Sequence, residues 1–124
     1  MDMKREEKLL IVESDPAIAE AIERAGERLQ MTSHRASDGW EAIEMLETEE
    51  YDAIVINTDL PRHSGFGVLT YLREEVGDDL GNVLLMTSAD DEQFRRKIPQ
   101  ERVRVLIKTT AVDEITNALR GEEA

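Results

Sequence analysis

The sequence contains no cysteine among its 124 residues, which excludes disulfide bonds and thiolate metal sites. No hydrophobic run approaches the roughly 18 residues that a membrane-spanning helix requires. Met1–Lys8 is charged and has no apolar stretch, so it is not expected to be a secretory signal peptide. These absences favour a cytoplasmic protein with no place in a membrane.

Basic residues are scarce, because 15 Lys and Arg stand against 28 Asp and Glu and give a formal net charge of −13. Phosphate backbones repel such a chain, so we expect no direct binding to nucleic acid. Three explanations of the acidity stay open. It could serve solubility, reflect adaptation to salt, or provide an acidic face for a basic partner.

Linkers, low-complexity stretches and repeats are absent too, so we expect a single domain over residues 1–124. Apolar strand-like runs alternate with segments of helical periodicity, which indicates βα units around a parallel sheet. The second run is polar in its centre and is expected at or near a sheet edge. The predicted strands are Lys8–Glu13, Met31–Ala36, Tyr51–Asn57, Asn82–Thr87 and Val103–Ile107.

A helix is predicted after each strand, and Asp15–Pro16 is a typical start signal with an acidic cap and a proline. Ser37 or Asp38 is expected to cap the second helix. The fourth, Asp90–Lys97, has few apolar anchors and is expected to be short and mobile before Pro99. Apolar positions recur at helical spacing: Ile18, Ile22, Ala25, Leu29; Ala42, Ile43, Leu46; Val68, Leu69, Leu72; Phe94, Ile98; Val112, Ile115, Ala118, Leu119.

Five such units with right-handed crossovers predict an α/β fold, a (βα)5 doubly wound five-stranded parallel sheet between two layers of helices. Ligands of such folds bind at the carboxyl ends of the strands, near the switch in strand order. The segment Tyr51–Gly65, YDAIVINTDLPRHSG, reads as a strand buried on both faces that ends at Asn57. Pro61 and Gly65 then break regular structure.

This segment resembles the third strand and following loop of the receiver domain of two-component response regulators. LLIVESDP at 9–16 resembles the family's first strand and acidic turn, and Thr87 and Lys108 resemble its switch hydroxyl and lysine. The resemblance covers nearly the whole chain and implies a flavodoxin-like three-layer sandwich with strand order 2-1-3-4-5. It also implies a phosphorelay signalling module rather than an enzyme. The partners it implies are a histidine kinase, another signalling domain or a second copy of the chain.

Two residues depart from the family's pattern. Asn57 stands where the family has its phospho-acceptor aspartate, and Ser14 replaces the second acid of the first-strand pair, while Glu13, Thr87 and Lys108 are kept. An amide forms no stable acyl phosphate, and Mg²⁺ usually needs carboxylate ligands. We therefore expect no phosphorylation of Asn57, no catalytic residue, weak or no Mg²⁺ binding and no other cofactor.

Glu13 and Lys108 leave this degenerate acidic pocket without net charge, so we expect Lys108 to pair with Glu13 or to bond with Asn57. The Thr87 hydroxyl is expected to bond with local backbone. Asp59 is not expected to replace the acceptor, because the family uses that position for a backbone contact to the metal, with the side chain pointing away.

A basic cluster falls on the fourth helix and fifth strand, which resemble the face that receivers use for partners. It contains Arg95, Arg96, Lys97, Arg102 and Arg104, with Val105 where the family often has an aromatic residue. The alternative is that these residues balance nearby acids: Asp90, Asp91, Glu92 and Glu101.

Three residues outside these clusters carry expectations of their own. His34 and His63 lie in polar surroundings and are expected to face solvent. Trp40 follows the cap of the second helix and is expected to be half-buried.

Three functions are weighed. The leading one is a receiver-like module that acts by protein–protein interaction, independently of aspartyl phosphorylation. The second is a phosphorylatable receiver with an Asp-to-Asn substitution at position 57, against which Ser14 argues. The third is a small-molecule-binding flavodoxin-like domain. Such domains bind phosphate groups at helix N-termini, but here the turn Glu13–Pro16 is negatively charged and its proline has no backbone N–H to donate, which disfavours an anion. Ala124 follows closely on the fifth helix, so no effector domain is expected.

Overall fold

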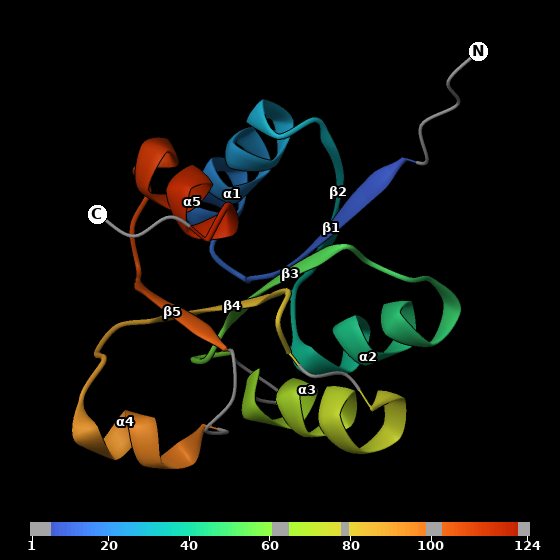
Figure 1. Ribbon diagram of the computed structural model, residues 1–124, viewed down its shortest axis with the longest axis vertical. Coiled ribbons are helices and arrows are strands. Elements are labelled where there is room, and N and C mark those ends of the chain that lie inside the picture. The colour runs from blue at the N-terminus through green and yellow to red at the C-terminus, as the bar shows by residue number, and fades with distance from the viewer. Residues whose placement is uncertain (1–5, 61–64, 78–79, 99–102, 122–124) are drawn as a thin grey trace.

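Five parallel strands form one sheet in the order β2-β1-β3-β4-β5 in the computed structural model (Figure 1). The structure describes residues 6–60, 65–77, 80–98 and 103–121. The predicted fold class, the strand order and the edge position of the second strand are confirmed. The strands are β1 (Glu7–Val12), β2 (Met31–Ala36), β3 (Ala53–Asn57), β4 (Val83–Thr87) and β5 (Arg104–Ile107).

Two layers of helices enclose the sheet, with α1 and α5 on one face and α2, α3 and α4 on the other (Figure 1). A π-helical segment, η1 (Leu72–Val76), continues α3 and was not predicted. The helices are α1 (Pro16–Arg28), α2 (Gly39–Thr48), α3 (Gly65–Tyr71), α4 (Glu92–Lys97) and α5 (Val112–Leu119). None of the described helices is long and apolar enough to cross a membrane.

The central strands are buried on both faces, which explains their continuous apolar runs. On β1, Leu10 and Val12 pack among α2, α3 and α4, whereas Leu9 and Ile11 pack among α1 and α5. Strands β3 and β4 are buried along their whole length. The core therefore lies on both sides of the sheet and leaves the strand ends to polar residues.

Acidic caps fix where the helices begin. Asp15 accepts hydrogen bonds from the backbone N–H groups of Ala17 and Ile18, and Pro16 opens α1 as predicted. Asp38, rather than Ser37, caps α2. The expectation for Trp40 is wrong, because this side chain is 59% exposed rather than half-buried.

Gly65 brings the start of α3 against the end of β3. A Cβ atom at this position would lie 2.7 Å from the Asn57 carbonyl oxygen and 2.8 Å from Ile56 Cγ2. Both contacts are shorter than van der Waals packing allows, so only glycine permits this approach. Gly65 thus helps to position the strand end that carries Asn57.

We predict that Gly65→Ala lowers the free energy of unfolding by about 1–3 kcal/mol, because the added methyl group pushes α3 away from β3. Urea denaturation measures the loss. Thr70→Ala, at an exposed position of the same helix, is the control and should change stability by less than about 0.5 kcal/mol. Equal stability of Gly65→Ala and wild type would contradict the close approach.

Candidate functional site

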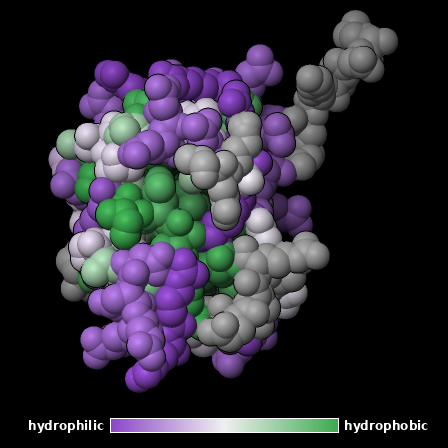
Figure 2. All heavy atoms as spheres, turned by 60° about the vertical axis from the view of Figure 1, so that its left-hand side comes forward, coloured by the Kyte–Doolittle hydropathy of each residue, from purple (hydrophilic) through white to green (hydrophobic). Residues whose placement is uncertain are grey.

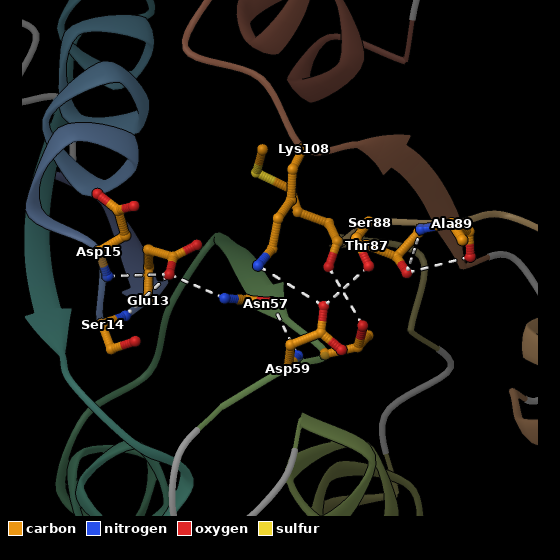
Figure 3. A network of polar contacts seen from close by, with 11 residues as sticks. Glu13, Ser14, Asp15, Asn57, Asp59, Thr87, Ser88, Ala89 and Lys108 are labelled. Atoms are coloured by element: carbon orange, nitrogen blue, oxygen red, sulfur yellow. Dashed lines mark hydrogen bonds and ion pairs between the residues drawn. The ribbon is translucent and has the colours of Figure 1, made fainter.

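Four of the polar residues singled out in the sequence gather at the carboxyl edge of the sheet (Figure 3). Glu13 follows β1, Asn57 ends β3, Thr87 ends β4 and Lys108 follows β5. Backbone bonds hold these ends in register, since the Lys108 N–H donates to the Thr87 carbonyl at 2.8 Å. The structure therefore brings these four residues together at one edge of the sheet, as the order of the strands predicts.

The Glu13 carboxylate is buried, with 4% of the residue exposed. Its Oε2 accepts three hydrogen bonds, from the backbone N–H of Ser14 at 2.9 Å, the backbone N–H of Asp15 at 3.1 Å and Asn57 Nδ2 at 2.8 Å. Its Oε1 has no partner among the described residues. One oxygen thus carries nearly all the donors that stabilise this charge.

Asn57 uses both ends of its amide. Nδ2 donates to Glu13, and Oδ1 accepts from the backbone N–H of Asp59 at 2.8 Å. The reverse orientation would place Asn57 Oδ1 against the Glu13 carboxylate and the Asn57 NH₂ group against the Asp59 N–H. The two contacts therefore determine which way the amide is oriented. Asn57 therefore ties the turn after β1 to the loop after β3.

Lys108 neither pairs with Glu13 nor bonds with Asn57, the two alternatives predicted from the sequence, and its Nζ instead lies 3.6 Å from Asp59 Oδ2. The expectation that the Asp59 side chain points away is also wrong, since Ser88 Oγ donates to the same Oδ2 at 3.4 Å. Lys108 thus lies at the more exposed carboxylate, and Glu13 Oε1 has no partner among the described residues. Glu13, Asp59 and Lys108 together carry a net charge of −1.

Ser88 was missed in the sequence, although it directly follows the end of β4 and so lies at the same edge. The Thr87 hydroxyl behaves as predicted, because it donates to the Ala89 carbonyl at 3.2 Å and accepts from the Ala89 N–H at 3.3 Å. Ser14 is exposed. Beside these residues lies a hollow of ≈190 Å³, lined by Thr58, Asp59, Phe66, Thr87, Ser88, Ala89, Asp91, Gln93, Phe94 and Lys97.

The arginines of the candidate partner face bond within the chain. Arg95 pairs with Asp90 at 2.6 Å, and this hydrogen bond lowers the pKa of the Asp90 carboxyl, against the opposing effect of burial. Arg96 pairs with Glu92 at 2.7 Å. For these two arginines, the structure supports the alternative that they balance neighbouring acids.

Arg104 points toward α5, where its Nη1 donates to the carbonyl oxygens of Ala118 at 2.5 Å and Leu119 at 3.2 Å. Arg104 thus supplies hydrogen-bond donors to carbonyl groups at the carboxyl end of α5, since the last carbonyl groups of a helix have no N–H partner within it. Val105 is half-buried against the core. Several residues singled out in the sequence lie outside the described residues: Pro61, His63, Pro99, Glu101 and Arg102.

His34 does not simply face solvent. Its Nδ1 lies 2.8 Å from the Tyr51 hydroxyl and 3.2 Å from Glu49 Oε2. Burial, and then the charge of Glu49, raises the pKa of Tyr51 to about 12. Within the described ranges, no three His, Asp or Glu side chains gather closely enough to hold a metal ion.

The family model of the response regulator receiver domain matches residues 9–120 of the chain. Response regulator MprA of Mycobacterium ulcerans is 36% identical over 88 residues, which cover 71% of this chain and 37% of that protein. The alkaline phosphatase synthesis transcriptional regulatory protein PhoP of Bacillus subtilis is 34% identical over 94 residues, 76% of this chain and 38% of that protein. The chain thus spans well under half the length of these relatives.

Solved structures share the fold. Chemotaxis protein CheY4 of Vibrio cholerae superposes with a TM-score of 0.83 at 16% identity, over 96% of this chain and 100% of that one. The signal receiver domain of an HD domain-containing protein from Pseudomonas fluorescens Pf-5 gives a TM-score of 0.78 at 25% identity, over 94% of each chain.

We predict that Asn57→Asp lowers the free energy of unfolding at neutral pH by about 1–3 kcal/mol, because a carboxylate then faces Glu13 without a donor. The loss should shrink as the pH falls toward 4, since one protonated carboxyl group can donate to the other. Denaturant titrations across this pH range measure it. Ser14→Ala removes an exposed hydroxyl and should leave stability nearly unchanged. A loss that does not depend on pH would contradict the facing carboxylates.

Proposed function

The chain belongs to the response regulator receiver domain family of two-component signalling, and from this membership we propose that it binds protein partners independently of aspartyl phosphorylation. The observation that carries the proposal is the Asn57 amide, which bridges the Glu13 carboxylate and the Asp59 backbone N–H. By resemblance, Asn57 stands where the family has its acceptor aspartate. A carboxamide at that position supplies neither the nucleophile nor a stable product.

The residues at the strand ends do not fit a Mg²⁺ ion, which the family implies for phosphoryl transfer. Mg²⁺ favours carboxylate oxygens in octahedral geometry and gives up its waters reluctantly. Here Glu13 Oε2 is occupied by three N–H donors and Asn57 Oδ1 accepts from Asp59, so Glu13 Oε1 is the one oxygen of these two side chains without a partner among the described residues. One carboxylate oxygen supplies few of the ligands that octahedral Mg²⁺ needs. Ser14 offers an exposed hydroxyl in place of a carboxylate. The pocket keeps one buried carboxylate, and the amide takes the bridging position between the two loops.

The partner surface in this proposal is the face of α4, β5 and α5. Figure 2 shows hydrophobic residues gathered between α4 and α5, along β5, with hydrophilic residues around them. Ile107, at the end of β5, is 49% exposed, and Val105 lies half-buried beside the core. Arg95 and Arg96 lie on the adjacent α4. An exposed apolar centre with a charged rim is typical of protein interfaces.

We predict that the wild-type chain gains no phosphoryl group from acetyl phosphate and Mg²⁺, as measured by intact mass. Ser14→Asp together with Asn57→Asp should become phosphorylated, because the pair restores the acceptor and the missing acid beside the retained Lys108. Ser14→Asp alone is the control, since it still lacks an acceptor. A phosphorylated wild-type chain would sink the proposal. Full phosphorylation of Asn57→Asp alone would instead favour a phosphorylatable receiver with a single substitution.

We predict that Ile107→Asp weakens partner binding at least about tenfold, because a charge replaces an apolar side chain at the centre of the contact. Val76→Asp, at an η1 residue that is 53% exposed, is the matched control and should bind as the wild type does. Sedimentation velocity measures self-association, and titration against histidine kinases and other signalling domains measures heterologous binding. Unchanged binding of Ile107→Asp would place the contact elsewhere.

A further inference from the structure

We propose that Asp59 occupies, from within the chain, an oxyanion site formed by Lys108 and Ser88, and so excludes external phosphate from the strand-end pocket. The inference deepens the proposed function and rests on it, because it adds a second reason why this receiver does not respond to phosphoryl groups. It concerns a side chain that the sequence led us to expect on the outside of the pocket.

The geometry puts a cation and a hydroxyl on one carboxylate oxygen. Asp59 Oδ2 lies 3.6 Å from Lys108 Nζ and accepts a hydrogen bond from Ser88 Oγ at 3.4 Å. Figure 3 shows the Asp59 carboxylate between these two side chains, which come from the ends of β5 and β4. A lysine and a hydroxyl that converge on one point form the arrangement that proteins use to bind phosphate oxygens. The carboxylate of Asp59 takes that place.

Asp59 is held in this position through its backbone. Its N–H donates to Asn57 Oδ1 at 2.8 Å, and Asn57 Nδ2 is anchored on the buried Glu13 carboxylate. The backbone of Asp59 is therefore held by the same amide that replaces the acceptor. The short side chain of Asp59 then reaches over the pocket toward Lys108.

Charge acts in the same direction. With Glu13, Asp59 and Lys108 the pocket carries −1, so an incoming phosphate meets net repulsion as well as an occupied lysine. Removing the Asp59 charge leaves Glu13 and Lys108, which balance each other. The Asp59 side chain is 51% exposed, so salt screens its pairing with Lys108, and the effect is greatest at low ionic strength.

The test is a titration with inorganic phosphate at low ionic strength, followed by the amide ¹H–¹⁵N resonances of Ser88, Ala89 and Lys108. We expect Asp59→Asn to bind phosphate at least tenfold more tightly than wild type, with these resonances moving together. Asp59→Asn combined with Lys108→Ala should lose the gain. Glu44→Gln removes one charge at an exposed position of α2 and should bind phosphate as wild type does.

Two outcomes overturn the inference. Equal phosphate affinity of Asp59→Asn and wild type would mean that Asp59 blocks nothing. An undiminished gain in the double variant would place the phosphate away from Lys108. The Asp59→Asn variant keeps its backbone N–H, and its amide spectrum reports whether the fold is retained. These outcomes are distinct from the one that would overturn the proposed function. That proposal fails if the wild-type chain becomes covalently phosphorylated, which the phosphate titration does not measure.

Discussion

The hydrogen bond from the Asn57 amide to the Glu13 carboxylate supplies a donor to a buried charge at the point where β1 and β3 end. A hydrogen bond to a charged group contributes about 1.5–3 kcal/mol, and a buried carboxylate without donors costs at least as much. Two backbone N–H groups also reach the same oxygen, but only the amide links it to a different loop. Asn57 is therefore the one side chain among the described residues that donates to Glu13 Oε2, while Glu13 Oε1 has no donor there.

Lys108 pairs with the more exposed of the two nearby carboxylates. Glu13 Oε2 already has three donors, and Glu13 Oε1 is buried and has no partner among the described residues. Among the described residues, the Asp59 carboxylate contacts Ser88 and Lys108. The pair therefore forms at the mouth of the pocket, where half of the Asp59 side chain still reaches water. The outcome is a site closed by neutral and ionic contacts between side chains of four loops.

The fold could be predicted from the sequence because its signals are local and strong. Buried parallel strands show as apolar runs, the polar β2 is placed at the edge by its composition, and Asp15, Asp38 and Asp91 sit where helix caps are needed. The partner of Lys108 could not be predicted, because it depends on where the side chains of Glu13 and Asp59 lie relative to Lys108 in the assembled site. The π-helical turn of η1 was missed because its residues, LREEV, favour an ordinary α-helix.

The proposed independence from phosphorylation sets a constraint on how such a receiver signals. A ligand shifts a conformational equilibrium only by its differential affinity for the two states. If neither a metal ion nor a phosphoryl group binds at the strand ends, no ligand there can shift the conformational equilibrium. The face of α4, β5 and α5 must then be able to bind its partner without such a shift. The exposed Ile107 at the end of β5 agrees with a face that is preformed rather than uncovered on activation. Regulation would then depend on the amount of the protein and of its partner, and the bonds at the strand ends would serve to hold that face in place.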